Sequence, residues 1–523
     1  MSLIKTNLKS DIVAGVVVSL IAIPLCLGIA RASGMPPFSG MIAGIVGGIV
    51  IGYISKSPLS VSGPAAGLIT IIATGISDMG IEGVLLASII GGLFQISLYF
   101  FRAGGIAYYF PSRVIEGMLT AIGITIILKN LPVLLGFPQI MNNEAPVYYI
   151  QKVVSDMEDQ INWIAMATGI SALLAMIAWD KFKPQALKVF PGALIAVIVG
   201  IAGYGFSQTQ TIGSFSSTDL VELPIIDSFS SFTHLFIFPD FGRILDSKVW
   251  VLGTTIGLVA SIETLLTIEA TDKIDPLKRV TPTNRELLAQ GIGNSLSGLL
   301  GGLPVTSVIV RSKANIDAGG RTKTATITHG IILLLGILII PQLLNMIPLS
   351  SLAAILVVTG YKLANPFLIK KGFSLSKHQW IPFVITIVAV LYTDLLRGVG
   401  LGMLAAIYFI LRGNMKSCYD LYYELRDGKP FYHIELSQEI SFLKKATMIK
   451  TLSRIPRNSQ VIIDAKKTIY IDFDVLELIK EFKDTTAPFK NIQLELINFK
   501  EAYQIESKYG VQVQHLKPHK TSI

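Results

Sequence analysis

The amino-acid sequence predicts an all-α polytopic membrane protein with a small α/β domain near its C-terminal end. Hydrophobic residues make up 51% of the 523 residues and charged residues only 15%, whereas about 25% of a typical soluble chain is charged. Apolar stretches without a charged residue, such as 12–30, 41–54 and 381–392, recur between Asp11 and Arg412. Stretches of about 20 such residues cross a lipid bilayer as helices.

About fourteen membrane segments, two of them short, account for these stretches. The first set lies near residues 11–30, 38–54, 63–77, 81–101, 112–136, 161–179 and 190–206, and the second near 248–271, 286–301, 304–316, 322–345, 349–361, 379–393 and 397–412. The first stretch is longer than the core of a signal peptide and no small-residue cleavage site follows it. We therefore expect it to be retained as a span.

The distribution of Lys and Arg predicts the orientation of these segments. Loops rich in basic residues lie on the cytoplasmic side. Alternate loops carry them, at Lys56, Arg102, Lys181 and Lys273. The opposite loops, around 77–82, 142–160 and 207–240, carry few. Both termini are therefore expected in the cytoplasm. Because the net charge of +9 is spread over short loops, it argues against a nucleic-acid partner.

Glycine and proline interrupt one short segment in each set. Residues 60–72 read SVSGPAAGLITII, and residues 301–312 read GGLPVTSVIVRS. Each is the third member of its set, and sets with an odd number of segments are inverted relative to each other. Paired interruptions at matching places indicate the binding site of a transporter. The alternative is that each proline only kinks a helix to improve its packing.

Helix N-termini present unpaired N–H groups and a partial positive charge, which favour an anion. In the predicted topology the two interrupted helices point their N-termini at each other near the membrane midplane. The donors would be the amides of Ala65, Ala66, Gly67, Thr306, Ser307 and Val308. The hydroxyls of Thr306 and Ser307 would add hydrogen bonds.

Glu263 lies in the apolar stretch ASIETLLTIEA. A charge at this depth costs about 2.5 kcal/mol or more, so such a residue is functional by default. Thr267 is four residues on and shares its helix face. The pair would hold a cation, or Glu263 would take up a proton. The alternative is a protonated Glu263 that hydrogen-bonds a neighbouring helix. Glu269 is expected to be a solvated residue near the helix end.

Two further residues have two interpretations each. The charge of Arg311 either draws anions from the cytoplasmic side or reaches the membrane interface along its aliphatic stem. Cys26 either lines the cavity or packs as a small buried residue, the second being favoured. With Cys418 as the only other cysteine, the sequence predicts no disulfide, no metal site and no cofactor.

The last part of the chain differs in pattern. FYHIEL, QVIIDA and IQLELI are expected to be strands, and residues 474–483 and 500–509 helices. This stretch, residues 430–515, contains no glycine-rich phosphate loop and no cluster of catalytic residues.

The chain resembles the sulfate permease family, also called SulP or solute carrier 26, over nearly its whole length. The resemblance rests on the motifs AIPLCLGIARASG, SVSGPAAGLI, TPTNRELLAQGIGN and GGLPVTSVIVRSKANIDAGGRTK. It implies a transmembrane domain of residues 1–414 with inverted repeats at about 11–206 and 248–412, in which a core domain moves against a gate domain. It also implies that residues 430–515 are a cytoplasmic STAS-like domain and that the protein is a homodimer.

The family's substrates are anions such as sulfate, bicarbonate, chloride, oxalate and dicarboxylates. The chain is most similar to a bacterial branch associated with carbonic anhydrase, which implies bicarbonate and a bacterial inner (plasma) membrane. We therefore expect a secondary-active transporter of small inorganic anions, bicarbonate or sulfate, that works by alternating access. It is not expected to be an enzyme.

The family's binding positions correspond to Leu25, Ile29, Ala65 and residues 306–308. Two of these positions depart from the family's pattern: Leu25 stands where many members have glutamine, and Ala65 where sodium-dependent bicarbonate members have threonine. Those members also have aspartate at the position of Glu263, while Thr267 is kept. Coupling to H⁺ through Glu263 and coupling to Na⁺ held by Glu263 and Thr267 therefore both stay open. In the STAS-like part, Asp474 stands near the usual phosphorylatable serine, so phosphorylation there is not expected.

Several other functions compete with this interpretation. A passive anion channel, a chloride exchanger and a dicarboxylate transporter all fit the family. A nucleobase transporter of the same architecture would need more polar side chains than Ala65 and Ala66 offer. A membrane-embedded enzyme lacks support, because the sequence shows no nucleophile–base pair.

Overall fold

The structure is a computed structural model. It describes residues 2–105, 111–137, 161–182, 190–209, 215–216, 219–224, 236–364, 377–393, 395–414, 419–426 and 428–499. The helix expected at 500–509 and Cys418 lie outside these residues. The chain divides into two compact units, Met1–Leu404 and Ala405–Ile523, and each is described by itself.

The first unit is built almost entirely of helices. Those of its first half are α1 (Ser2–Ala32), α2 (Pro37–Val46) continued by a π-helical turn (Gly47–Ile51) and α3 (Gly52–Ile54), α4 (Ile69–Phe100), α5 (Ser112–Leu134), α7 (Trp163–Phe182) and α8 (Gly192–Thr209). The second half contains α10 (Ser247–Ile274), α11 (Thr283–Leu299), α12 (Ile309–Asp317), α13 (Lys323–Ile339), α14 (Pro341–Leu344), α15 (Leu349–Ala364) and α17 (Lys377–Tyr392). Helix α18 (Leu395–Asn414) begins in the first unit and ends in the second.

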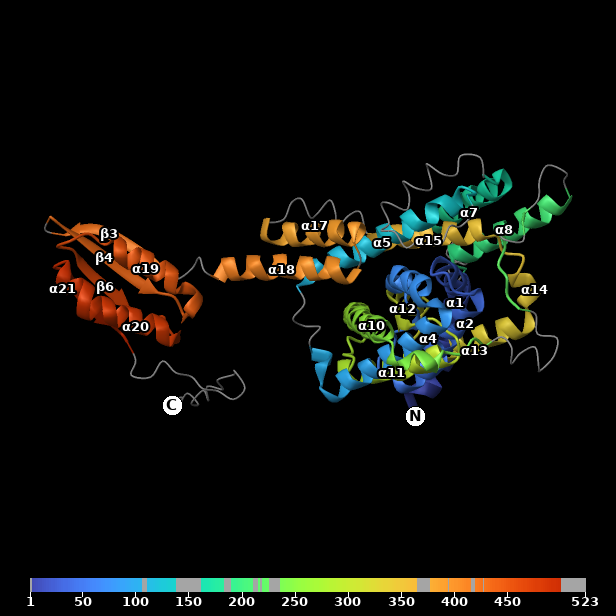
Figure 1. Ribbon diagram of the computed structural model, residues 1–523, viewed down its shortest axis with the longest axis horizontal. Helices are drawn as coiled ribbons and strands as arrows, with labels where there is room; N and C mark the ends of the chain where they lie inside the picture. Colours follow the sequence, from blue (N-terminus) through green and yellow to red (C-terminus); the bar gives the residue numbers. More distant parts are fainter. Residues whose placement is uncertain are drawn as a thin grey trace, which may run out of the picture. The chain divides into compact units, whose positions relative to one another are not determined.

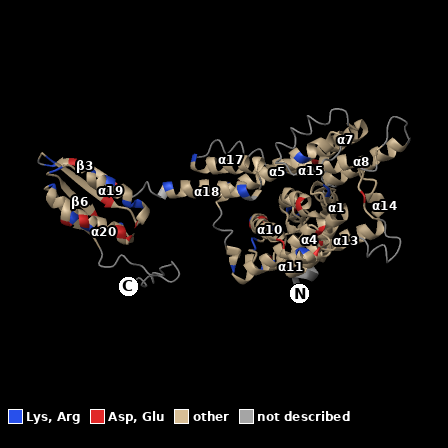
Figure 2. Ribbon diagram, in the orientation of Figure 1, with Lys and Arg blue, Asp and Glu red and all other residues tan. Residues whose placement is uncertain are grey.

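Hydropathy and length together support a membrane location for this unit. Among the described residues, six helices are long and apolar enough to cross a membrane, and four shorter ones are also apolar. Figure 2 shows that charged residues are sparse along the helices of this unit. The prediction of a predominantly helical membrane part is therefore confirmed, although the number of crossings does not follow from helix lengths alone.

One long helix is two segments joined by a sharp turn. Within α4, Gly80 has φ 76° and ψ 174°, a backbone conformation that residues with a Cβ rarely adopt. The turn falls between the expected segments 63–77 and 81–101. A single glycine therefore separates the short interrupted helix from the span that follows it.

The helices of the first unit pack in two groups. Helices α1, α2, α4 and α10–α13 pack against one another, with α4 against α10 and α11 and α1 against α13. Helices α5, α7, α8, α15 and α17 form the second group, with α5 against α15 and α17. Figure 1 shows the second group running along one side of the first. Each group draws helices from both halves of the sequence, as inverted repeats require.

The second unit contains a four-stranded sheet in the order β3 (Tyr419–Arg426), β4 (Lys429–Leu436), β6 (Gln460–Asp464) and β8 (Gln493–Ile497). Strand β3 is antiparallel to β4, and the other neighbours are parallel. A small pair, β5 (Glu439–Ile440) and β7 (Tyr470–Ile471), lies outside this sheet. Helices α19 (Lys445–Arg454), α20 (Phe473–Glu481) and α21 (Ala487–Phe489) complete the unit.

Buried aliphatic side chains hold this small α/β unit together. Ile434 and Ile463 of the sheet pack with Met448 of α19 and Val475 of α20, all essentially unexposed. The three strands expected from the sequence and the helix near 474–483 are present. The sheet also contains β3, which begins at Tyr419, before residue 430.

Candidate anion-binding site

The two interrupted segments meet as a short antiparallel ladder. Strand β1 (Ser62–Pro64) pairs with β2 (Val305–Ser307), so that Ser62 lies opposite Ser307 and Gly63 opposite Thr306. Helix α4, with a preceding 3₁₀ turn (Ala66–Leu68), leaves one end of this ladder and α12 leaves the other. Pairing satisfies backbone groups that lipid cannot hydrogen-bond, and the ladder brings two helix starts to one point.

Several of the amides predicted to bind the anion are already hydrogen-bonded, which corrects that expectation. The Ala65 N–H donates to Pro304 O at 3.0 Å and the Val308 N–H to Val61 O at 2.9 Å. The Ser307 N–H donates to Thr264 Oγ1 at 3.2 Å. The helices therefore begin later than their Gly-Pro signals, at the 3₁₀ turn and at Ile309. Pro64 is the last residue of β1 and Pro304 directly precedes β2, and neither has an N–H group to donate.

The two hydroxyls predicted at the site differ in their surroundings. Both Thr306 and Ser307 are completely buried. The Ser307 hydroxyl shares a 2.5 Å hydrogen bond with the hydroxyl of Ser60. Thr306 Oγ1 has no hydrogen-bond partner among the described residues. Because the carboxyl of Glu263 faces this hydroxyl, Thr306 is the residue of the ladder that lies beside the acidic side chain of α10.

Glu263 lies beside the start of α4. Its carboxyl faces the amide of Gly67 and the hydroxyl of Thr306, and a Cβ on Gly67 would lie 3.0 Å from Glu263 Oε2. Within the part of the chain that the structure describes, Oε2 makes no hydrogen bond of standard geometry. Thr267, buried one turn further along α10, lies on the same helix face. An acidic group here sits where the helix dipole favours negative charge.

Arg311 is entirely buried, which excludes the expectation that it reaches the membrane interface. Its Nη2 group donates to Cys26 Sγ at 3.3 Å. The guanidinium covers Gly63, where an added Cβ would lie 2.0 Å from Nη1. Its Nε and Nη1 atoms lack hydrogen-bond partners in the described residues. Cys26 is therefore a hydrogen-bond acceptor for a buried cation as well as a packing residue.

His329 is a residue that the sequence analysis did not single out. It is completely buried on α13 and interacts electrostatically with Arg311. Neither of its ring nitrogens has a hydrogen-bond partner among the residues described. The available signal was a lone histidine in the apolar stretch 322–345. Together, Arg311 and His329 leave several buried polar atoms unpaired close to β1.

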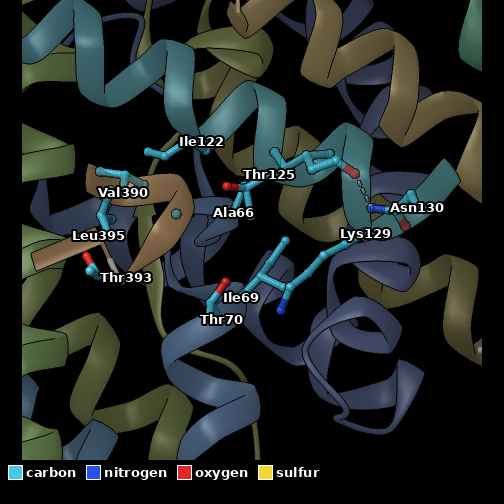
Figure 3. A pocket seen from close by; sticks show the side chains of 12 residues that line it. Ala66, Ile69, Thr70, Ile122, Thr125, Lys129, Asn130, Val390, Thr393 and Leu395 are labelled. Atoms are coloured by element: carbon cyan, nitrogen blue, oxygen red, sulfur yellow. Dashed lines mark hydrogen bonds between the residues drawn. The ribbon is translucent and has the colours of Figure 1, made fainter. Parts of the chain in front are cut away.

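The family positions on α1 face different surroundings. Leu25 lines a cavity of about 790 Å³ together with Ile309 and Val310 at the start of α12. Ile29 is buried and does not line this cavity. Ala66 and Gly67 line a second cavity, between the start of α4 and helix α5 (Figure 3). The structure thus places the predicted residues around the ladder, with one cavity beside each helix start.

A polar row on α11 holds the ladder and gives the motif TPTNRELLAQGIGN a role. Asn294 accepts from the Val305 N–H at 2.5 Å and donates to the Val305 carbonyl at 3.0 Å. Gln290 donates to Ser62 Oγ at 2.8 Å and to Glu286 Oε1 at 3.0 Å. These α11 residues lie at intervals of four and share a face. The four-residue spacing in the sequence indicates that these side chains share one face of α11, but it does not indicate which residues that face contacts.

A relay connects this row to the helix that carries Glu263. Asn294 donates to Gln95 Oε1 of α4 at 2.7 Å, and Gln95 donates to Ser261 Oγ of α10 at 3.2 Å. All three side chains are buried. The relay therefore ties α4, α10 and α11 to Val305, the residue just before Thr306.

Comparison with known proteins identifies the family. A model of the sulfate permease family matches residues 8–396. This chain belongs to the sulfate permease family. The bicarbonate transporter BicA of Synechocystis sp. is 27% identical to it, over 76% of this chain and 69% of BicA. The sodium-independent sulfate anion transporter of Bos taurus is 23% identical, over 94% of this chain and 84% of that protein.

A solved structure shares the fold. The structure of SLC26A9 aligns with a TM-score of 0.74 at 14% identity and covers 96% of this chain and 86% of that chain. The sulfate permease family and the relatives named above are transporters of anions, not enzymes. The resemblance drawn from the sequence motifs is confirmed.

Proposed function

We propose that this member of the sulfate permease family is a secondary-active transporter of small inorganic anions, bicarbonate or sulfate, coupled to H⁺ or Na⁺. The observation that carries the proposal is the ladder between β1 and β2, which brings the starts of α4 and α12 together. Helix starts favour anions, and the partly unpaired guanidinium of Arg311 lies behind the ladder. The named relatives transport the same class of ion.

In this proposal the anion is held at the ladder and at the start of α12. The residues involved are Leu25, Ile29, Ala65, Ala66, Thr306, Ser307, Val308 and Arg311. The hydroxyl of Thr306 supplies a hydrogen bond, and the completely buried Arg311 acts through its charge. Glu263 and Thr267 bind the coupling ion, as a proton on Glu263 or as Na⁺ held by both oxygens.

Transport by alternating access fits the unequal cavities on the two sides of the ladder. The cavity at α12 has a volume of about 790 Å³, whereas the one at α4 has about 20 Å³, room for about one water molecule. Access from one side at a time is what alternating access requires, and it favours a transporter over a passive channel. The group α5, α7, α8, α15 and α17 would be the gate domain and the other group the core domain.

We further propose a domain organisation, a membrane location and an oligomeric state for the protein. Residues 1–414 form the transmembrane domain and residues 430–515 a cytoplasmic STAS-like domain. The protein would span a bacterial inner membrane as a homodimer with both termini in the cytoplasm. The sheet with one antiparallel and two parallel neighbours supports a separate soluble domain.

Uptake by purified protein in proteoliposomes tests the proposal. Labelled bicarbonate and labelled sulfate are offered separately, with a pH gradient or a Na⁺ gradient imposed one at a time. We expect accumulation of one of these anions above equilibrium under one of the two gradients. Flux that only follows the anion's own gradient would instead identify a passive channel, and absence of flux for both anions would exclude the proposed substrates.

A further inference from the structure

Lys129 is a charged residue inside the second helix group. It lies on α5, within the sequence AIGITIILKNLP, and its side chain is half-buried. No hydrogen bond or ion pair joins its ammonium group to any residue that the structure describes. Ionisable residues within membrane segments are rare, are usually paired, and otherwise mark an ion pathway.

The surroundings of Lys129 are those of the second cavity. Figure 3 shows its side chain extending toward the start of α4, where Ala66, Ile69 and Thr70 lie. Thr125 lines the same cavity from α5. Gly67 lines this cavity too, and it also faces Glu263. The start of α4 therefore lies between a cation from one helix group and a carboxyl from the other.

The cavity on the other side of the ladder offers an informative contrast. Its wall from the same helix group also carries a lysine, Lys362 of α15, but that ammonium forms a 2.9 Å ion pair with Asp180. Among the described residues, no carboxylate pairs with Lys129 in this way. Within this helix group, the free lysine thus faces the narrow cavity and the neutralised lysine faces the wide one, which Lys313 of α12 also lines.

We propose that Lys129 is a gate-side anion-binding residue, which contacts a small inorganic oxyanion entering from the α4 side of the ladder. This inference rests on the proposed transport function. In the present conformation the cavity has room for about one water molecule, so the anion meets the ammonium when the two helix groups separate on this side. The ammonium supplies a charge-assisted hydrogen bond opposite the partial positive charge of the α4 start.

The competing explanation is that Lys129, a lysine near a helix end, extends its ammonium group to the membrane interface. Such a lysine would point away from the ladder and would serve both transport directions equally. An anion contact at one entrance affects only anions that arrive through that entrance. The sidedness of the effect therefore distinguishes the two explanations.

The test uses Lys129→Gln and Lys129→Arg in the full-length protein, with uptake measured from the medium by cells and from the opposite face by inside-out vesicles. Labelled bicarbonate and sulfate serve as probes. For Lys129→Gln we expect KM to rise about tenfold from one face and to stay within about twofold from the other. Lys129→Arg keeps the charge and should stay within about threefold of wild type on both faces.

Lys248→Gln is the matched control, because Lys248 is an exposed lysine at the start of α10. It should change KM from neither face. An unchanged KM in Lys129→Gln, or an equal rise from both faces, would overturn the assignment while wild-type uptake still supports the transport function. If the wild type carries neither anion, it is the transport function that fails.

Discussion

The starts of α4 and α12 share one sequence signal but face different side chains. Each follows a Gly and Pro interruption and a three-residue strand. The α4 start consists of small apolar residues and faces the carboxyl of Glu263. The α12 start follows the hydroxyls of Thr306 and Ser307, and α12 carries the buried Arg311.

In the function proposed above, this difference corresponds to a division of labour between the two helix starts. The same helix-end electrostatics act at both starts. At α4 the protein's own carboxylate occupies the favourable position, and a coupling cation can neutralise it. At α12, Thr306 Oγ1 and two nitrogen atoms of Arg311 have no hydrogen-bond partner among the described residues, and we propose that they serve an exogenous anion. We therefore propose that the surroundings of the α4 start serve coupling and those of the α12 start serve substrate binding.

The largest effect is expected from Glu263→Gln. The change keeps the size of the side chain but removes its charge and its proton, so gradient-driven accumulation should be abolished while the protein stays folded. Uptake in proteoliposomes and thermal unfolding measure the two properties. Glu269→Gln is the matched control on the same helix, because Glu269 forms a 2.7 Å ion pair with Lys273 near the helix end. Normal accumulation by Glu263→Gln would remove the coupling role.

The second-largest effect is expected from a negative charge introduced at the start of α12. Ser307→Glu places a carboxylate where the anion's charge is expected, so anion affinity should fall far below that of wild type. Ser307→Ala removes only the hydroxyl bonded to Ser60 and should weaken binding by about 0.5–1.5 kcal/mol. Calorimetry on purified protein measures both affinities.

The register partner of Ser307 provides a comparison across the ladder. Ser62→Ala removes a hydroxyl bonded to Gln290 on the other strand and should affect anion affinity less than Ser307→Ala. Equal losses from Ser307→Ala and Ser307→Glu would contradict the view that helix starts dominate binding. A larger loss from Ser62→Ala would reverse the assignment of the anion to the α12 side.

Loss of a side chain from the polar row on α11 is expected to lower both stability and anion affinity. Asn294→Leu leaves the N–H and carbonyl of Val305 without their side-chain partner, at a cost of about 1–3 kcal/mol for each buried group. We expect a lower unfolding temperature together with weaker anion binding. Gln95→Leu removes only the relay behind Asn294 and should cause a smaller loss of both. Unchanged anion affinity in Asn294→Leu would show that the ladder keeps its geometry without this clamp.

The smallest effect on selectivity is expected from removal of the residues that follow α18. A chain that ends at residue 414 keeps both helix starts, so its preference between bicarbonate and sulfate should equal that of the full chain. Dimer yield or transport rate should fall. Competition uptake assays measure the preference, and a changed ratio would show that the soluble part contributes to substrate choice.

Much of the membrane part was predictable because its signals are local. Apolar length located the helices, and Gly80 falls where the expected segments 63–77 and 81–101 divide. The buried position of Glu263 also followed from its apolar neighbours. The hydrogen-bond partners of individual amides could not be predicted, because the Ser307 N–H donates to Thr264 of another helix. The hydrogen bond between Arg311 and Cys26 could not be predicted either, because the two residues are 285 positions apart.

The sequence by itself determined the membrane class, the family, the two interrupted helices and the acidic residue among apolar ones. These properties depend on composition, periodicity and short motifs, which are carried by neighbouring residues. Only the tertiary structure decided that the interruptions pair as strands, that Arg311 turns inward beside His329, and that Lys129 remains unpaired over α4. Such contacts join residues from different helices, and their partners are set by packing across the whole unit, which no local pattern encodes.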